Sequence, residues 1–257
     1  MLAKSGAFLV WSLVFVVTFG TLAFAQPKEG GILFGDFFDR DELGNAYEIV
    51  NPDPNRLAVA GGQLLIVATP ASEAPTFMNK VVEVKNGIYL KQTFSGDFVA
   101  TVKLTMQVEA GHITGMRYRV DDENELFVGL WGVEKGRDNI GYDLPGYYYS
   151  QAPPKRHPFF RKVVNGEADV RLLQGAQVGQ RILASYATQP EVWYLQLERR
   201  GVQYTGRVST DGRQWTEIGS HTLLPKNGRL GLTAYLDWKQ GHENSAEFDD
   251  FVVRGKQ

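Results

Sequence analysis

The sequence predicts an all-β protein, a two-sheet antiparallel β-sandwich. Three observations support this fold class. Short segments alternate apolar and polar residues with a period of two, Asn-Gly, Asp-Gly and Gly-Gly pairs separate them, and no long segment has a helical period. Strands of this kind bury one face only, so two such sheets have to pack against each other.

The strands are predicted in order along the chain. Residues 57–59 and 64–67 flank Gly61-Gly62 and form a hairpin signature, and residues 98–106 show the clearest alternation. Residues 116–120 and 126–130 flank the polar turn 121–124, so they are predicted to be neighbouring strands.

The last quarter of the chain, from Trp193 to Val253, is the most informative segment. Trp193, Leu195 and Leu197 alternate with polar residues and Tyr194, which predicts a half-buried strand. Turns are expected at Arg200-Gly201 and Asp211-Gly212, with the return strand beginning at Trp215. Because Trp193 and Trp215 both fall in strand phase, both are expected in the core.

The first 25 residues have the pattern of a secretory signal peptide. Lys4 precedes an apolar run that ends on Ala23-Phe24-Ala25, a cleavage signature. We therefore predict a secreted or periplasmic protein. A retained membrane anchor is the alternative, because a spanning helix needs about 20 apolar residues.

Residues 26–257 are predicted to form one domain. They are numerous enough to fold around one core without cysteine cross-links, and the sequence has no cysteine. The net charge of the whole chain is −2, which argues against nucleic acid as a partner. A membrane is excluded as a partner unless the signal segment is retained.

Several turn and core motifs occur in a characteristic order. They are Asp36-Phe37-Phe38-Asp39, Asn51-Pro52-Asp53-Pro54, Gly61-Gly62-Gln63-Leu64, Gly115-Met116-Arg117-Tyr118, Asp121-Asp122-Glu123-Asn124, residues 209–215 and Phe248-Asp249-Asp250-Phe251. In this order the chain resembles the concanavalin A-like lectin/glucanase superfamily, and within it the sandwich modules found C-terminal to bacterial β-xylosidases. The resemblance implies a jelly-roll sandwich, association with carbohydrate and, in many relatives, a structural calcium ion.

Four aspartates are the predicted calcium ligands: Asp36, Asp39, Asp249 and Asp250. The resemblance implies a site where the first and last strands meet, and calcium prefers oxygen ligands. Phe248 and Phe251 are three residues apart, so a β-bulge at Asp249-Asp250 is needed for both rings to face the core. The alternative is an edge strand whose charges prevent aggregation.

Residues 134–161 are predicted to be a long aromatic loop, because four prolines and six aromatic residues replace the alternating pattern. Sugar sites combine flat aromatic rings with a few polar groups. The predicted carbohydrate-binding residues are Trp131, Tyr142, Tyr147, Tyr148 and Trp238, with Arg137, Asp138, Asn139, Asp143 and Asp237 as polar partners. The alternative is that these rings pack the loop onto the sandwich.

The chemistry of a glycosidase needs two carboxylates at a defined separation. Glu123 and Glu125 would project from one face of a strand, about 7 Å apart, and Asp143 is a further candidate. The Glu-x-Asp-x-x-Glu signature of laminarinase-type sandwiches is absent, and the histidines lack the spacing of a catalytic zinc site. No catalytic residue is therefore assigned.

The favoured function is a secreted, non-catalytic protein that binds a polysaccharide or surface glycan. Two alternatives stay open: a glycoside hydrolase-like enzyme that acts on glycans, and a calcium-stabilised structural or adhesive module. Apart from calcium, no cofactor is expected.

Overall fold

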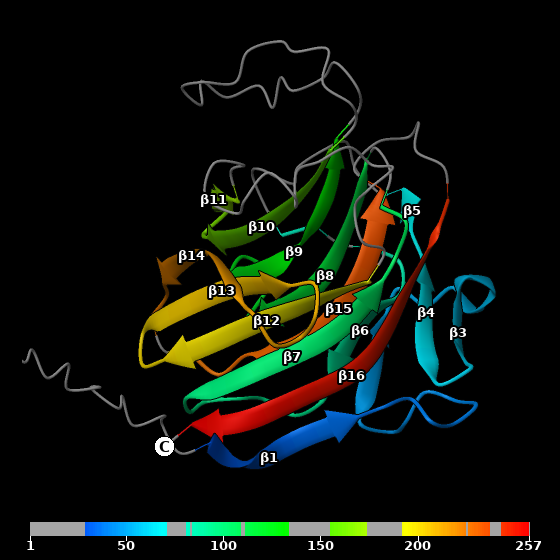
Figure 1. Ribbon diagram of the computed structural model, residues 1–257, viewed down its shortest axis with the longest axis horizontal. Coiled ribbons are helices and arrows are strands. Elements are labelled where there is room, and N and C mark those ends of the chain that lie inside the picture. Colours follow the sequence, from blue (N-terminus) through cyan, green and yellow to red (C-terminus); the bar gives the residue numbers. More distant parts are fainter. Residues whose placement is uncertain are drawn as a thin grey trace, which may run out of the picture.

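A computed structural model of the protein describes residues 29–70, 81–82, 84–108, 111–133, 155–173, 192–224, 226–236 and 243–256. Within these ranges the chain forms two largely antiparallel sheets of eight strands, packed face to face (Figure 1). This confirms the predicted β-sandwich. No helix in these ranges is long and apolar enough to cross a membrane. The signal segment and most of the predicted aromatic loop lie outside the described residues.

Sheet A forms the front layer in Figure 1, in the order β14-β13-β12-β7-β16-β4-β3, with β1 also beside β16. Its strands are β1 (Glu29–Asp36), β3 (Leu57–Ala60), β4 (Gln63–Val67), β7 (Phe98–Thr105), β12 (Val192–Arg200), β13 (Gln203–Ser209), β14 (Thr216–Thr222) and β16 (Ser245–Lys256).

Sheet B forms the rear layer, in the order β11-β10-β9-β8-β15-β6-β2, with the short β5 parallel to β15. Its strands are β2 (Tyr47–Val50), β5 (Thr69–Pro70), β6 (Gly87–Leu90), β8 (His112–Arg119), β9 (Glu125–Val133), β10 (Lys155–Val164), β11 (Glu167–Leu172) and β15 (Arg229–Leu236). A 3-10 turn, Pro54–Arg56, precedes β3.

The main core lies between the two sheets and follows the predicted alternation. In β7 every second residue, from Phe98 to Leu104, is fully buried, and the intervening residues are partly exposed. In β12 Trp193, Leu195 and Leu197 are likewise fully buried. Burial of each large apolar side chain stabilises the fold by about 1.5–3 kcal/mol, so these rows fix which face of sheet A meets solvent.

A β-bulge divides β16, as the sequence predicts. The pairing with β7 shifts between Asp249 and Val252, and Asp250 has a positive φ of 50°. Phe248 and Phe251 are both fully buried as a result. At the bulge β16 also changes its second neighbour, from β4 for residues 245–248 to β1 for residues 251–256.

The boundary of the predicted loop is wrong at its C-terminal end. Residues from Lys155 onward belong to β10, which pairs with β9 on one side and β11 on the other. Phe159 and Phe160 are fully buried on opposite faces of this strand. The tight Asn165-Gly166 turn after β10, where both φ angles are positive, lets β11 return beside it.

Candidate functional site

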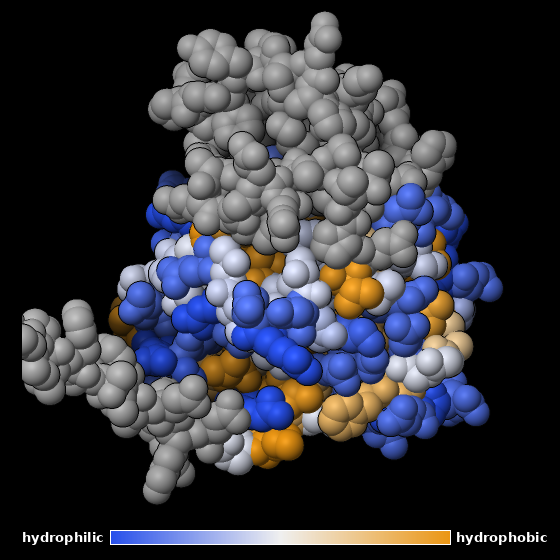
Figure 2. Space-filling view, in the orientation of Figure 1, coloured by the Kyte–Doolittle hydropathy of each residue, from blue (hydrophilic) through white to orange (hydrophobic). Residues whose placement is uncertain are grey.

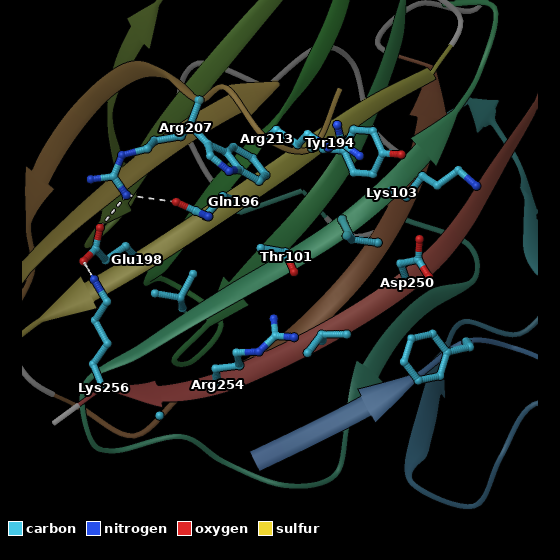
Figure 3. Close-up of a pocket in the computed structure, with 17 residues that line it drawn as sticks. Thr101, Lys103, Tyr194, Gln196, Glu198, Arg207, Arg213, Asp250, Arg254 and Lys256 are labelled. Carbon is cyan, nitrogen blue, oxygen red and sulfur yellow. Dashed lines mark hydrogen bonds and ion pairs between the residues drawn. The ribbon is translucent and has the colours of Figure 1, made fainter. Parts of the chain in front are cut away.

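The outer face of sheet A carries a groove with a volume of about 760 Å³. Its floor consists of the outward-facing residues of β12, β7 and β16, the three strands at the centre of the sheet (Figure 3). Figure 2 shows hydrophilic residues over the middle of this face and hydrophobic residues toward β16 and β1. The groove is lined by Phe37, Val99, Thr101, Val102, Lys103, Tyr194, Gln196, Glu198, Arg207, Gly212, Arg213, Trp215, Asp250, Val252, Arg254, Gly255 and Lys256.

Strand register arranges the floor in rows. Tyr194 lies opposite Lys103, which lies opposite Asp249. Two residues along the strands, Gln196 lies opposite Thr101. Side chains of directly paired residues project from the same face of a sheet, so each row presents its side chains together to solvent. The alternation that buries Trp193 and Leu195 exposes the residues between them at the floor of the groove.

At one end of the groove a single carboxylate holds three cations. Glu198 accepts a hydrogen bond of 2.5 Å from Arg200 Nε and is also paired with Arg207 and Lys256 (Figure 3). Arg207 also donates to Gln196 Oε1 at 3.0 Å. Burial alone would raise the pKa of Glu198, but hydrogen bonds from Lys256, Arg200 and Arg207 lower it to about 2. The carboxylate therefore stays ionised and its oxygens are occupied.

The turn between β13 and β14 forms one wall of the groove. Asp211 Oδ1 accepts backbone hydrogen bonds of 2.8 Å from both Arg213 and Gln214, and these bonds lower its pKa. Gly212 has a φ of 69° and packs against the Tyr194 ring, where an added Cβ would lie 3.2 Å from Cε1. This compact turn places Arg213 and Trp215 at the groove.

Trp215 differs from its prediction. The sequence predicts it in the core, but it is half-buried and lines the groove on the outer face. The reason is that β14 begins only at Thr216, so Trp215 belongs to the turn and strand phase does not determine its direction.

The other end of the groove is acidic as well as basic. Lys103 Nζ lies 3.2 Å from Asp249 Oδ2. Burial and the nearby carboxylates of Asp249 and Asp39 raise the pKa of Asp250, and Lys103 opposes this effect. The β-bulge therefore places Asp250 at the groove, where Figure 3 shows it near Lys103.

The outer face of sheet B is largely buried over its central strands, which the sequence analysis missed. Phe127 and Phe159 form a second apolar cluster there with four other buried residues: Val82, Val84, Ile113 and Tyr235. The run Leu126-Phe127-Val128-Gly129-Leu130-Trp131 is almost continuously apolar, which is the signal of a strand buried on both faces.

A charged trio lies within this second cluster. Glu125, Arg117 and Arg161 are all fully buried, and Glu125 is paired with both arginines. Arg117 Nη1 lies 3.5 Å from Glu125 Oε2 and also donates to the Val82 carbonyl oxygen at 2.8 Å. Its guanidinium carbon lies 4.8 Å from the centre of the Phe127 ring, a cation–π contact.

The predicted pair of acids is not brought together. Glu123 is exposed in the turn before β9, where its backbone nitrogen donates to Asp121, whereas Glu125 is buried between arginines. The assumption that both lie on one regular strand is wrong, because β9 begins only at Glu125. The third candidate acid, Asp143, lies outside the described residues.

Of the predicted carbohydrate-binding residues, only Trp131 is described. It lies near the end of β9 and packs, half-buried, against the second apolar cluster. Tyr142, Tyr147, Tyr148 and Trp238 lie outside the described residues, as do their polar partners Arg137, Asp138, Asn139, Asp143 and Asp237. The aromatic-loop site stays a prediction.

Two of the predicted calcium ligands are paired with cations. Asp36 forms a two-pronged contact with Arg40, with Nη2 2.5 Å from Oδ2, and Asp249 pairs with Lys103. A calcium ion would compete with both cations. Among the described residues, no three His, Cys, Asp or Glu side chains are placed to hold one metal ion. Calcium binding by Asp36, Asp39, Asp249 and Asp250 stays a prediction.

Comparison with known proteins relates the chain to others through its fold. No protein-family model and no curated protein matches the sequence. Similar solved structures include the Bacteroides ovatus xyloglucan PUL protein GH43B (16% identity, TM-score 0.58) and the xylan β-1,4-xylosidase of Bacillus halodurans C-125 (15%, 0.60). The matches cover 90% and 87% of this chain, but only 40% and 39% of those proteins.

A third similar structure is matched over almost its whole length. The β-glucanase of Bacillus licheniformis has 10% identity and a TM-score of 0.54, and the match covers 87% of this chain and 98% of that one. At these identities the similarity shows the fold alone. The chain has the β-sandwich fold of these structures, the jelly roll that the order of its motifs implies.

Proposed function

We propose that the protein is an exported carbohydrate-binding sandwich without catalytic activity, and that the groove on sheet A binds a glycan. The observation that carries this proposal is the combination of Tyr194 and Trp215 with hydrogen-bonding side chains in one open groove. Its volume of about 760 Å³ falls within the range of about 300–1,000 Å³ that is typical of ligand sites.

The lining suits the two kinds of surface that a sugar presents. Aromatic rings pack against the apolar C–H faces of a pyranose, and Tyr194, Trp215 and the half-exposed Phe37 supply such rings. Gln196 and Thr101 can bond hydroxyl groups between them. A site with rings on its floor and wall beside these polar groups would hold the saccharide by stacking and orient it by hydrogen bonds.

The charges in the groove favour binding over cleavage. Glycoside hydrolysis needs a proton donor and a second carboxylate across the scissile bond. Glu198 has a pKa of about 2 and its oxygens are occupied by cations, so near neutral pH it is a poor proton donor and a poor nucleophile. Asp250 is the other carboxylate that lines the groove, so the lining offers one acid besides Glu198 and not the pair that hydrolysis needs. The xylosidase and β-glucanase names of similar structures support a polysaccharide as the ligand class.

The test is affinity electrophoresis or pull-down of the purified chain on a broad panel of polysaccharides. Tyr194→Ala and Trp215→Ala should each weaken binding by roughly tenfold, because stacking contributes about 0.5–1.5 kcal/mol beyond the apolar area that is buried. Reducing-end assays on the same panel should show no release of sugar, and release would favour the glycosidase alternative.

Trp131→Ala removes a half-buried tryptophan of the predicted aromatic-loop site on the other sheet, so it should leave binding in the groove unchanged. Tyr147→Ala and Trp238→Ala test the aromatic-loop site. Loss of binding in these three variants, with Tyr194→Ala and Trp215→Ala unaffected, would move the site to the predicted loop. Failure of the unaltered chain to bind any member of the panel would refute the proposed function.

A further inference from the structure

The groove on sheet A is strongly cationic in a chain that is slightly acidic overall. Its lining contains two carboxylates, Glu198 and Asp250, against five basic side chains: Lys103, Arg207, Arg213, Arg254 and Lys256. The formal net charge of the whole chain is −2. Charge of one sign concentrated in a hollow attracts ligands of the opposite sign.

The ion pairs within the groove do not cancel this excess. Glu198 is shared by Arg200, Arg207 and Lys256, so one negative charge meets three positive charges. Lys103 is balanced by Asp249. The excess positive charge at Glu198 is held in a fixed arrangement, because the same carboxylate binds all three cations. A ligand that uses these cations would not have to order them first.

Two further arginines are available for direct contact. Arg213 is exposed on the turn and Arg254 is half-buried on β16, and within the described residues neither is part of an ion pair. Figure 3 shows Arg213 next to Tyr194, and the Arg254 side chain along the floor between the two ends of the groove. A guanidinium group matches the oxygens of a carboxylate or sulfate in a two-pronged arrangement.

We infer that the groove selects an anionic glycan, one whose sugar units carry carboxylate or sulfate groups. This inference rests on the proposed function and adds the ligand class: Tyr194 and Trp215 stack on sugar rings while Arg213, Arg254 and the cations around Glu198 bind the acidic substituents. The shared chemistry is a saccharide with a negative charge at regular intervals, of which uronates and sulfate esters are the two sources.

The experiment measures binding of the full chain to a neutral xylan or glucan, a polyuronate and a sulfated polysaccharide, at about 0.05 M and about 0.5 M salt. Affinity for one of the anionic polymers should exceed that for the neutral ones at low salt and fall at high salt, because the Debye length shortens. The polymer that binds identifies the source of the charge. Arg213→Gln and Arg254→Gln should each reduce this affinity by roughly tenfold, as expected for loss of a charge-assisted hydrogen bond.

Arg171→Gln is the matched control, since it removes an exposed arginine from β11 of sheet B. An equal loss of affinity in this variant would overturn the inference, because the attraction would then belong to the whole surface. Tight binding of neutral glycans without salt dependence would overturn the inference but leave the proposed function standing. Absence of binding to every polymer would overturn both.

Discussion

The two outer faces of the sandwich carry similar charge clusters in opposite environments. On sheet B Glu125 is shared by Arg117 and Arg161, and all three side chains are sealed from solvent beside an apolar cluster. On sheet A Glu198 is shared by three cations, two of which, Arg207 and Lys256, line an open groove. In the sealed cluster the charges contact one another and neighbouring protein groups, so the cluster serves stability, whereas the open cluster leaves cations available to a ligand.

The largest expected difference between the faces is the effect of removing the central carboxylate on sheet B. Glu125→Gln leaves two buried arginines without their counter-charge, so it should lower the free energy of unfolding by about 3–5 kcal/mol. Urea denaturation at neutral pH measures this loss. The control is Glu123→Gln in the adjacent turn, which should change stability by less than about 0.5 kcal/mol because the side chain is exposed. A loss below about 1 kcal/mol for Glu125→Gln would contradict a structural role.

The charge cluster around Glu198 on sheet A should make the stability of the protein depend on pH. The pKa of Glu198 is about 2 in the folded protein, below its ordinary value of 4.5. Its stabilising effect is therefore complete above pH 4.5 and is lost as the pH falls toward 2. The full shift corresponds to about 3 kcal/mol, which solvent screening of the exposed Arg200 reduces to about 2 kcal/mol.

Glu198→Gln should abolish this part of the acid sensitivity. The difference in unfolding free energy between about pH 6 and about pH 3 should be smaller in the variant than in the unaltered chain. Glu217→Gln, which removes an exposed carboxylate on β14 at the edge of the same sheet, should keep the full difference. Equal acid sensitivity in all three proteins would show that Glu198 does not stabilise the open face.

The smallest expected effect separates stability from binding on sheet A. Gly212→Ala and Gly201→Ala both force alanine into a left-handed conformation, so each should lose about 1 kcal/mol of stability. Only Gly212 lies against the Tyr194 ring, whereas an added Cβ at Gly201 meets open space. Glycan binding should therefore fall in Gly212→Ala and persist in Gly201→Ala. Equal binding by the two variants would argue against a role for Tyr194.

The sequence predicts the fold better than the site for a physical reason. Alternation and turn chemistry are local, so the hairpins at Gly61-Gly62 and Gly201 and even the bulge at Asp249-Asp250 follow from short segments. The groove depends instead on β12, β7 and β16 lying side by side, although β7 is far from the other two in sequence. No local sequence pattern predicts that these three strands are neighbours in the sheet.

The candidate acids Glu123 and Glu125 and the second apolar cluster illustrate the same limit. The residues before Glu125 are typical of a solvated turn, and those after it are typical of a strand. Only the pairing of β9 with β8 and β10 surrounds the Glu125 side chain with arginines. The apolar run from Leu126 to Trp131 contained the signal for a strand covered on both faces. Period-2 alternation is easier to recognise than its absence.

The bulge in β16 also determines the parity of the strand. Before it, even-numbered residues such as Phe248 point inward, and after it odd-numbered residues such as Phe251 and Val253 do so. If the same sequence ran as a regular strand without the bulge, Arg254 and Lys256 would point into the apolar core and Phe251 would face solvent. The bulge thus gives the two halves of one strand opposite frames, so that the first half supplies Phe248 to the core and the second half supplies Arg254 and Lys256 to the groove.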